Sequence, residues 1–173
     1  VRADIEGPCV LEIGHGPGHL LKALASDQYA AFGIDLSPQM VRLTRRRLLR
    51  AGLPLRHTRA KAQTLPFPAV HFDTVVSTFP APYITDPATL QEIYRVLRPG
   101  GKLLILHSAH PLGHRPPERL ARFALSIGRS PQPSKNLLMQ MDAKFQQAGF
   151  IGQTDWLLVP PDKVLIYSGR RPS

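Results

Sequence analysis

EIGHGPGHL, residues 12–20, decides the fold of this chain. The stretch overlaps a short apolar run, Cys9–Ile13, which is typical of a buried strand, and it leads into a helical pattern over His19–Ala25. Glycines at a strand-to-helix turn let the backbone bend sharply and approach a ligand closely. The next predicted strand, Tyr29–Ile34, ends at Asp35. A carboxylate there can accept hydrogen bonds from both ribose hydroxyls of a nucleoside.

The spacing of the glycines distinguishes between two kinds of nucleotide ligand. A dinucleotide fingerprint, G-x-G-x-x-G, would need a glycine where this chain has His19. The third glycine is Gly18, so the pattern is G-x-G-x-G, with Glu12 two residues before its start. This spacing gives less reason to expect a pyrophosphate and better suits an adenosine with a zwitterionic tail. A tight turn without a ligand is the alternative explanation.

Strand and helix patterns keep alternating through the first half of the chain. We expect further strands at residues 55–59, 72–78 and 103–106, and helices at residues 38–51 and 86–97. The polar strand at 55–59 is expected near a sheet edge, and Pro99-Gly100-Gly101 is expected to form a turn. Such alternation predicts a parallel sheet with helices on both faces.

The pattern changes after His107. Residues 108–135 are rich in Pro, Arg and Ser, with one candidate short helix at 118–127, and a helix is predicted at 137–148. Two candidate strands, 153–159 and 164–168, are joined by a turn that is too short for a crossover helix, so they should be antiparallel. We therefore predict one α/β domain over residues 1–173, with a Rossmann-like, doubly wound sheet that is mostly parallel.

Composition narrows the class of protein. The chain has 173 residues, with 22 Lys and Arg against 12 Asp and Glu, a net charge of +10. Its single cysteine, Cys9, excludes a disulfide framework and a four-cysteine zinc site. No apolar run approaches the ~18 residues of a membrane span, and VRADIEGP at the start is too polar for a signal peptide. We expect a cytoplasmic protein. The first residue is Val, which is compatible with a missing N-terminal segment.

Four stretches of the chain resemble the class I S-adenosylmethionine-dependent methyltransferases: residues 10–20, 33–41, 65–77 and 90–106. They occur in the family's order, and the last contains the specific sequence RVLRPGG. The chain is most similar to the ubiquinone/menaquinone-methyltransferase-like subfamily (methyltransferase type 11). This resemblance implies a sheet of roughly seven strands with the last antiparallel. It also implies S-adenosyl-L-methionine as the cofactor and S-adenosyl-L-homocysteine as the product.

The resemblance also implies a set of cofactor contacts. The methionine tail would be faced by Glu12, Gly14, His15, Gly16 and Gly18, and the ribose would be held by Asp35. The adenine would be bordered by Leu36 and Met40, and its edge would meet Lys61, Ala62 and Gln63. The sulfonium would lie beside Ser77, Thr78 and Phe79.

One position departs from the family pattern. The family usually carries an Asp two residues before the position of Gln63, where this chain has Lys61. A lysine has donors only and cannot accept a hydrogen bond from the adenine amino group. The backbone amide of Ala62 can still donate to a ring nitrogen. We therefore expect measurable cofactor binding with weaker recognition of adenine.

Methyl transfer from a sulfonium is a direct displacement, so the protein mainly aligns the acceptor with the methyl carbon. A base is needed only when the acceptor must first lose a proton. The two candidates for a catalytic role are Tyr83 and His107. The alternatives are that Tyr83 packs its loop on the sheet, or walls an acceptor pocket with Phe79, and that His107 is an ordinary loop histidine. No metal site is expected, because His107, His110 and His114 have no acid nearby except Glu118.

The preferred function is methyl transfer to a small hydrophobic or aromatic acceptor. One alternative is an RNA or other nucleic-acid methyltransferase, suggested by the charge alone, and another is a cofactor-binding domain without activity. Residues 108–135 are a candidate cover for the acceptor, and their basic, amphipathic pattern is compatible with contact to an anionic membrane. The arginines at residues 42–50 are interpreted as a solvated helix face.

Overall fold

The computed structural model describes residues 2–111, 134–159 and 162–173. Seven strands form one sheet in the order β3-β2-β1-β4-β5-β7-β6. They are β1 (Cys9–Ile13), β2 (Ala30–Asp35), β3 (His57–Arg59), β4 (Phe72–Thr78), β5 (Leu97–Pro111), β6 (Ile151–Val159) and β7 (Asp162–Arg170). The first five strands are parallel to one another, whereas β7 lies antiparallel between β5 and β6. The predicted Rossmann-like sheet with an antiparallel last strand is confirmed.

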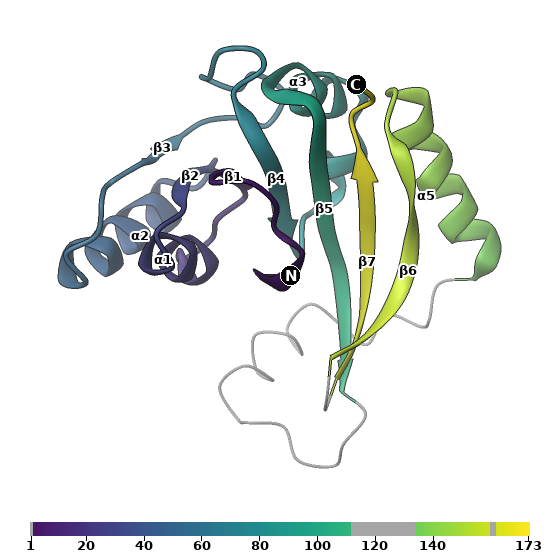
Figure 1. Ribbon diagram of the computed structural model, residues 1–173. Coiled ribbons are helices and arrows are strands. Elements are labelled where there is room, and N and C mark those ends of the chain that lie inside the picture. The colour runs from purple at the N-terminus through teal and green to yellow at the C-terminus, as the bar shows by residue number, and fades with distance from the viewer. Residues whose placement is uncertain (1, 112–133, 160–161) are drawn as a thin grey trace.

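The described residues also form four α-helices and two short 3-10 helices. They are α1 (His19–Ser26), α2 (Pro38–Arg50), α3 (Pro87–Val96), α5 (Lys135–Gln147), η1 (Arg2–Asp4) and η2 (Pro82–Thr85). Ser37 caps α2 by accepting a hydrogen bond from the Met40 amide, and Asp86 caps α3 in the same way through Ala88. Figure 1 shows α1 and α2 together at one side of the molecule and α5 alongside β6 at the other.

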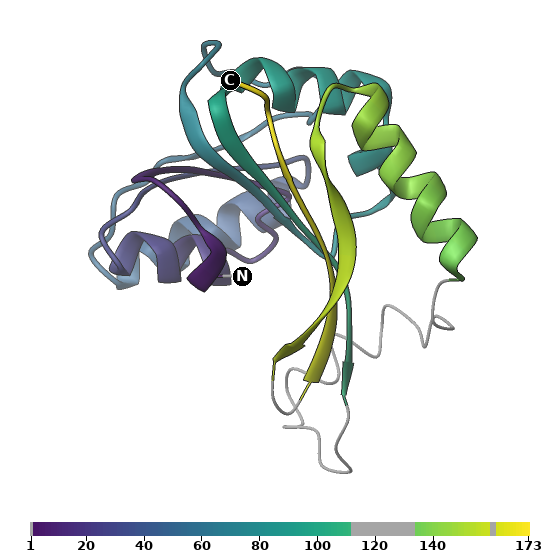
Figure 2. The same ribbon diagram turned by 45° about the vertical axis from the view of Figure 1, so that its right-hand side comes forward.

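The core lies on both faces of the sheet, because neighbouring strand residues point to opposite sides. On β1, Val10 packs in the cluster that holds Leu24 of α1 and Leu48 of α2, while Leu11 packs in the cluster of α3 and α5. Figure 2 shows the two helix layers separated by the twisted sheet. β1, which is buried on both faces, reads as a short apolar run, and this explains why it could be recognised from the sequence.

The predicted turn at Pro99-Gly100-Gly101 is wrong. These residues lie inside β5, which begins at Leu97 directly after α3. Leu97 pairs with Phe72, and the pairing resumes at Lys102 opposite Thr74 after an irregularity. Gly100 has a φ of 75°, so the irregularity is absorbed at a residue without a Cβ.

The strand predicted at 103–106 is also longer than expected, because β7 pairs with β5 as far as Pro111. Two other predictions are confirmed: β3 lies at a sheet edge, and β6 and β7 are antiparallel. The candidate helix at 118–127 and most of the insert at 108–135 lie outside the described residues. Within the part of the chain that is described, no helix combines the length and apolar character needed to cross a membrane.

Candidate active site

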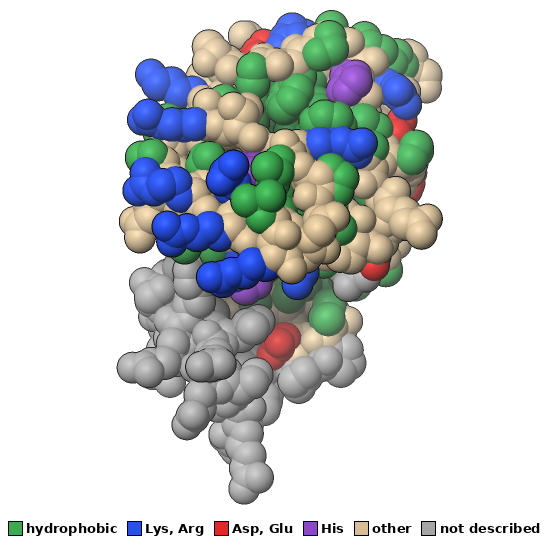
Figure 3. Space-filling view, turned by 90° about the vertical axis from the view of Figure 1, so that its left-hand side faces the viewer, with side chains coloured by type: hydrophobic (Ala, Val, Ile, Leu, Met, Phe, Trp, Pro, Cys, Tyr) green, Lys and Arg blue, Asp and Glu red, His purple; other side chains and the backbone are tan. Residues whose placement is uncertain are grey.

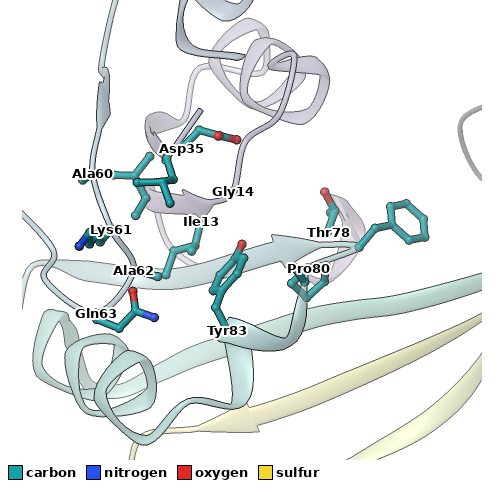
Figure 4. Close-up of a pocket in the computed structure, with 14 residues that line it drawn as sticks. Ile13, Gly14, Asp35, Ala60, Lys61, Ala62, Gln63, Thr78, Pro80 and Tyr83 are labelled. Atoms are coloured by element: carbon teal, nitrogen blue, oxygen red, sulfur yellow. The ribbon is translucent and has the colours of Figure 1, made fainter. Parts of the chain in front are cut away.

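A cleft of about 320 Å³ opens at the carboxyl ends of β1, β2 and β4. The chain leaves β1 toward β2 and β3 on one side and reaches β4 on the other, so the cleft lies where the strand order reverses. Open α/β sheets bind ligands at this switch point. Its lining residues are Ile13, Gly14, Ile34, Asp35, Leu36, Ala60, Lys61, Ala62, Gln63, Thr78, Phe79, Pro80, Ala81 and Tyr83. Figure 4 shows how these side chains surround the cleft.

Asp35 joins the glycine loop to the start of α2. Its Oδ2 accepts a hydrogen bond from the Gly16 amide at 2.8 Å, and its Oδ1 accepts one from the Ser37 amide at 2.8 Å. Each carboxylate oxygen has a second lone pair, so Asp35 can still accept hydrogen bonds from a ligand in the cleft. The position at the end of β2 therefore combines a structural role with the capacity to hold a diol.

His15 does not line the cleft, and it is buried, with 3% of its surface exposed. Its Nδ1 lies 2.8 Å from the Gly16 carbonyl oxygen and 3.2 Å from Thr44 Oγ1, and its ring meets His57 edge-on. Thr44 in turn donates to the Gly16 carbonyl. Burial is the main cause that lowers the pKa of His15. The histidine therefore supports the glycine loop through its contacts with Gly16 and Thr44.

Glu12 is the buried acid beneath the loop. Burial raises its pKa to about 8, against the smaller lowering effect of a hydrogen bond from the Leu21 backbone. Its Oε2 has no hydrogen-bond partner in the described structure, although it is buried. A buried, unpaired carboxyl oxygen is costly, and a cationic group would stabilise its ionised form. Glu12 does not line the cleft directly.

Tyr83 projects from η2 into the middle of the cleft. Its hydroxyl lies so close to the glycine loop that a Cβ built on Gly14 would be 2.4 Å from Tyr83 Oη. Figure 4 shows the ring between the segment of Ala62 and Gln63 and the end of β4 at Thr78. Burial is the first cause that raises the pKa of Tyr83, while a hydrogen bond with Ser77 lowers it. The phenol is therefore protonated at neutral pH.

The wall predicted for the adenine edge is held in place by α3. Gln63 donates to Asp86 Oδ2 at 3.2 Å, and the Leu65 amide donates to Glu92 Oε2 at 2.7 Å. Arg95 donates to the carbonyl oxygens of Leu65 and Phe67. Lys61 lines this wall and its side chain is exposed. The chain between β3 and β4 is thus an ordered wall although it contains no helix.

The other side of the cleft begins where β4 ends. Ser77 is buried and donates to the Ile13 carbonyl at 2.7 Å, so it ties β4 to β1. Phe79 has a φ of 51°, and its amide donates to the Leu106 carbonyl at 2.7 Å. A positive φ is uncommon for a bulky residue and marks a constrained turn. This turn carries Pro80 and Ala81 into the lining.

Eight of the fourteen predicted cofactor residues line the cleft: Gly14, Asp35, Leu36, Lys61, Ala62, Gln63, Thr78 and Phe79. The other six lie around it without lining it: Glu12, His15, Gly16, Gly18, Met40 and Ser77. Sequence reasoning did not name Ile13, Ile34, Ala60, Pro80 and Ala81 for the cleft. Their only signal was that each adjoins a predicted strand end or a predicted site residue.

The two catalytic candidates are placed differently. Tyr83 lines the cleft, whereas His107 does not. Burial lowers the pKa of His107 to about 4, so its imidazole is neutral at pH 7, and its ring packs near Phe145. Within the described residues no group of three His, Cys, Asp or Glu side chains is arranged to hold a metal ion. The side chains of His110 and His114 lie outside that description.

Comparison with known families gives a match over slightly more than half of the chain. A family model of methyltransferase domains matches residues 10–101. The chain is 32% identical over 147 residues to the uncharacterized methyltransferase YdaC of Bacillus subtilis, covering 83% of this chain and 72% of that protein. It is 28% identical over 183 residues to the ubiquinone/menaquinone biosynthesis C-methyltransferase UbiE of Shewanella frigidimarina, covering 90% and 73%.

Solved structures share the fold. The YcgJ protein of Bacillus subtilis superposes with a TM-score of 0.70 at 18% identity, covering 99% of this chain and 95% of that one. A phosphoethanolamine N-methyltransferase of Haemonchus contortus, described in complex with phosphomonomethylethanolamine and S-adenosylhomocysteine, superposes with a TM-score of 0.70 at 19% identity. In that case the match covers 99% of this chain and 51% of the other.

Proposed function

Because this chain belongs to the methyltransferase domain family, we propose that it transfers the methyl group of S-adenosyl-L-methionine to a small hydrophobic or aromatic acceptor. The observation that carries the proposal is the position of Asp35. It lies in the cleft at the end of β2 and accepts a hydrogen bond from the Gly16 amide of the glycine loop. One carboxylate thus links the ribose side of the expected cofactor with the loop that would hold its tail.

The residues present fit this cofactor. Asp35 retains lone pairs for the ribose hydroxyls, and the unpartnered Oε2 of Glu12 is the buried acceptor beneath the loop that a cationic tail would stabilise. Gly14 leaves room that a Cβ would fill between the loop and Tyr83. The bound cofactor supplies the activated methyl group and the leaving group. The protein's own residues bind the cofactor, orient the acceptor toward the methyl group and exclude water from the cleft.

The acceptor side of the cleft supports a hydrophobic or aromatic substrate. Past Thr78 the lining consists of Phe79, Pro80, Ala81 and Tyr83, none of which is charged. Such a wall binds an apolar molecule through burial and leaves the Tyr83 hydroxyl as its polar group. With its pKa raised by burial, the Tyr83 phenol keeps its proton and does not act as a base at neutral pH.

Nucleic acid is the less favoured acceptor. Among the cleft residues in the described part of the chain, Lys61 is the one cation, and the negative charge of Asp35 offsets its positive charge. A phosphate backbone entering this cleft would meet little positive charge, although phosphate contacts dominate nucleic-acid affinity. The net charge of +10 therefore does not by itself favour an RNA substrate.

The test is transfer of a labelled methyl group. The full chain is incubated with methyl-labelled S-adenosylmethionine and either a lipid and quinone extract or total RNA, with an Asp35→Ala variant as the control. The expected result is label in the organic-soluble fraction that depends on Asp35. Label recovered in RNA instead would support the nucleic-acid alternative. Cofactor binding without transfer to either fraction would support a domain that binds the cofactor without activity.

A further inference from the structure

A second hollow lies between α1 and α2, on the outer side of the glycine loop, with a volume of about 360 Å³. It shares no lining residue with the cleft. Its lining residues are Pro17, Lys22, Leu43, Arg46, Arg47 and Arg50. Four of these six are cations, and none is an acid. Figure 3 faces this side of the molecule and shows many separate Lys and Arg side chains there, with little acidic surface among them.

Three of the five arginines of α2 line the hollow. Arg46 and Arg50 are four residues apart, and Arg47 lies three residues before Arg50, so all three share one side of the helix. Arg42 and Arg45 do not line the hollow. The hollow is therefore a local convergence of charge from α1 and α2. It is not simply the consequence of an arginine-rich helix.

The cations of the hollow lie on helices that carry no acid of their own, since neither α1 nor α2 contains an Asp or Glu. The ion pairs recorded in the described residues involve Arg95, Arg98, Lys102 and Arg170, which lie elsewhere. Like charges three or four residues apart on a helix repel one another, and an anion bound among them would relieve this repulsion.

The hollow is also held in shape. The half-buried Arg47 donates to the carbonyl oxygen of Pro17, which fixes its guanidinium against the glycine loop. A guanidinium has five N–H donors, so donors remain for a ligand. Arg46 and Arg50 are exposed and present planar forks that suit phosphate oxygens. The positive field reaches His19, whose pKa is lowered first by burial and then by Arg47 and Lys22.

We propose that this hollow binds the phosphate group of a small, soluble phosphorylated molecule. The concave shape favours such a ligand over a nucleic acid or an anionic membrane, because an extended polyanion would engage the exposed Arg42 and Arg45, which do not line the hollow, as strongly as the residues that do. Arg46 and Arg50 would clamp the phosphate oxygens, Lys22 would close the site from α1, and Leu43 would contact the apolar part of the ligand.

Two double variants of equal charge test the proposal. Inorganic pyrophosphate is titrated into the full chain by calorimetry at constant ionic strength, without S-adenosylmethionine. We expect saturable binding that Arg46→Gln/Arg50→Gln weakens at least about tenfold and Arg42→Gln/Arg45→Gln weakens less than about threefold. Circular dichroism checks that both variants fold. An equal loss in the two variants, or no saturable binding to the wild type at millimolar pyrophosphate, would overturn the proposal.

Two further probes separate the possible sources of phosphate. A single-stranded RNA and vesicles containing phosphatidylglycerol are titrated under the same conditions. If either binds more tightly than pyrophosphate, with a steep salt dependence and equal weakening in both double variants, the surface serves a polyanion and the proposal is wrong. The proposal is independent of methyl transfer, because Arg46→Gln/Arg50→Gln should still bind S-adenosylmethionine normally.

Discussion

Gly14 and Tyr83 both line the cleft and approach each other closely there. Gly14 has a φ of 71°, and an added Cβ would lie 2.4 Å from Tyr83 Oη but 3.7 Å from Tyr83 Cζ. The hydroxyl oxygen is therefore the obstacle to a side chain at this position. A glycine is needed here both for its backbone conformation and for the room it leaves.

This pair leads to a prediction of non-additive stability. Gly14→Ala should destabilise the fold by about 2–4 kcal/mol through strain and overlap. Tyr83→Phe removes the oxygen, so the double variant should recover part of that loss. Urea unfolding of the wild type, both single variants and the double variant measures the coupling. Strictly additive losses would show that the Tyr83 hydroxyl does not obstruct a side chain at position 14.

Glu12 predicts a pH dependence of stability. Its pKa is raised from 4.5 to about 8 in the folded protein, first by burial. A carboxyl whose pKa is raised by folding favours the folded state while it is protonated. The contribution of Glu12 to the free energy of unfolding is therefore fully present below about pH 4.5 and is lost as the pH rises toward about 8.

The Glu12→Gln variant isolates this effect, because the amide keeps an acceptor for the Leu21 backbone and carries no charge. We expect the stability difference, variant minus wild type, to grow from about pH 5 to about pH 8 and then level off. Urea unfolding across this range measures the difference. A difference that stays constant with pH would contradict the assignment of a raised pKa to Glu12.

At the scale of the elements, α3 supports the wall formed by the chain between β3 and β4. Arg95 donates to the carbonyl oxygens of Leu65 and Phe67 and pairs with Glu92 at 2.6 Å. Arg95→Ala should cost about 1–2 kcal/mol, since two carbonyl groups lose their donor. The same change should weaken binding of S-adenosylmethionine, because Lys61, Ala62 and Gln63 belong to this wall.

Arg98→Ala is the matched control, because it removes an arginine at the start of β5 that pairs with Asp73 at the surface. A single exposed ion pair contributes less than about 1 kcal/mol. Thermal unfolding and cofactor titration of both variants are the measurements. Equal effects of the two substitutions on cofactor binding would show that α3 does not support the cleft through Arg95.

The elements of the sheet were predictable because their signals are local. Apolar runs indicated β1 and β2, β-branched residues indicated β4, and Ser37-Pro38 and Asp86-Pro87 indicated where α2 and α3 begin. Pro99-Gly100-Gly101 misled because its residues are typical of turns, whereas pairing of Leu97 with Phe72 extends β5 through them. That pairing is a tertiary contact, and local residue preferences do not report it.

The site was predictable at its strand ends and less so around them. Asp35 follows from its place after β2, and it lies in the cleft. The inward position of His15 depends on Thr44 and His57, which come from α2 and β3. Tyr83 reaches Gly14 from 69 residues further along the chain. Contacts of this kind depend on the assembled sheet, so spacing within one segment could not reveal them.

At the scale of the whole molecule, the net charge of +10 is unevenly placed. The cleft contains Asp35 and Lys61, while the hollow between α1 and α2 holds four cations without an acid. We thus propose methyl transfer and anion binding at separate surfaces that meet at the glycine loop, since Pro17 belongs to the hollow and Gly14 to the cleft.

Calorimetric titration of S-adenosylmethionine into the full chain tests the central claim most directly. Wild type should bind one equivalent, and Asp35→Ala should bind at least about tenfold more weakly, because hydrogen bonds to a charged group contribute about 1.5–3 kcal/mol each. Asp155→Ala, which removes an exposed acid on β6, should bind like wild type. No saturable binding at millimolar cofactor by a chain that circular dichroism shows to be folded would contradict the account.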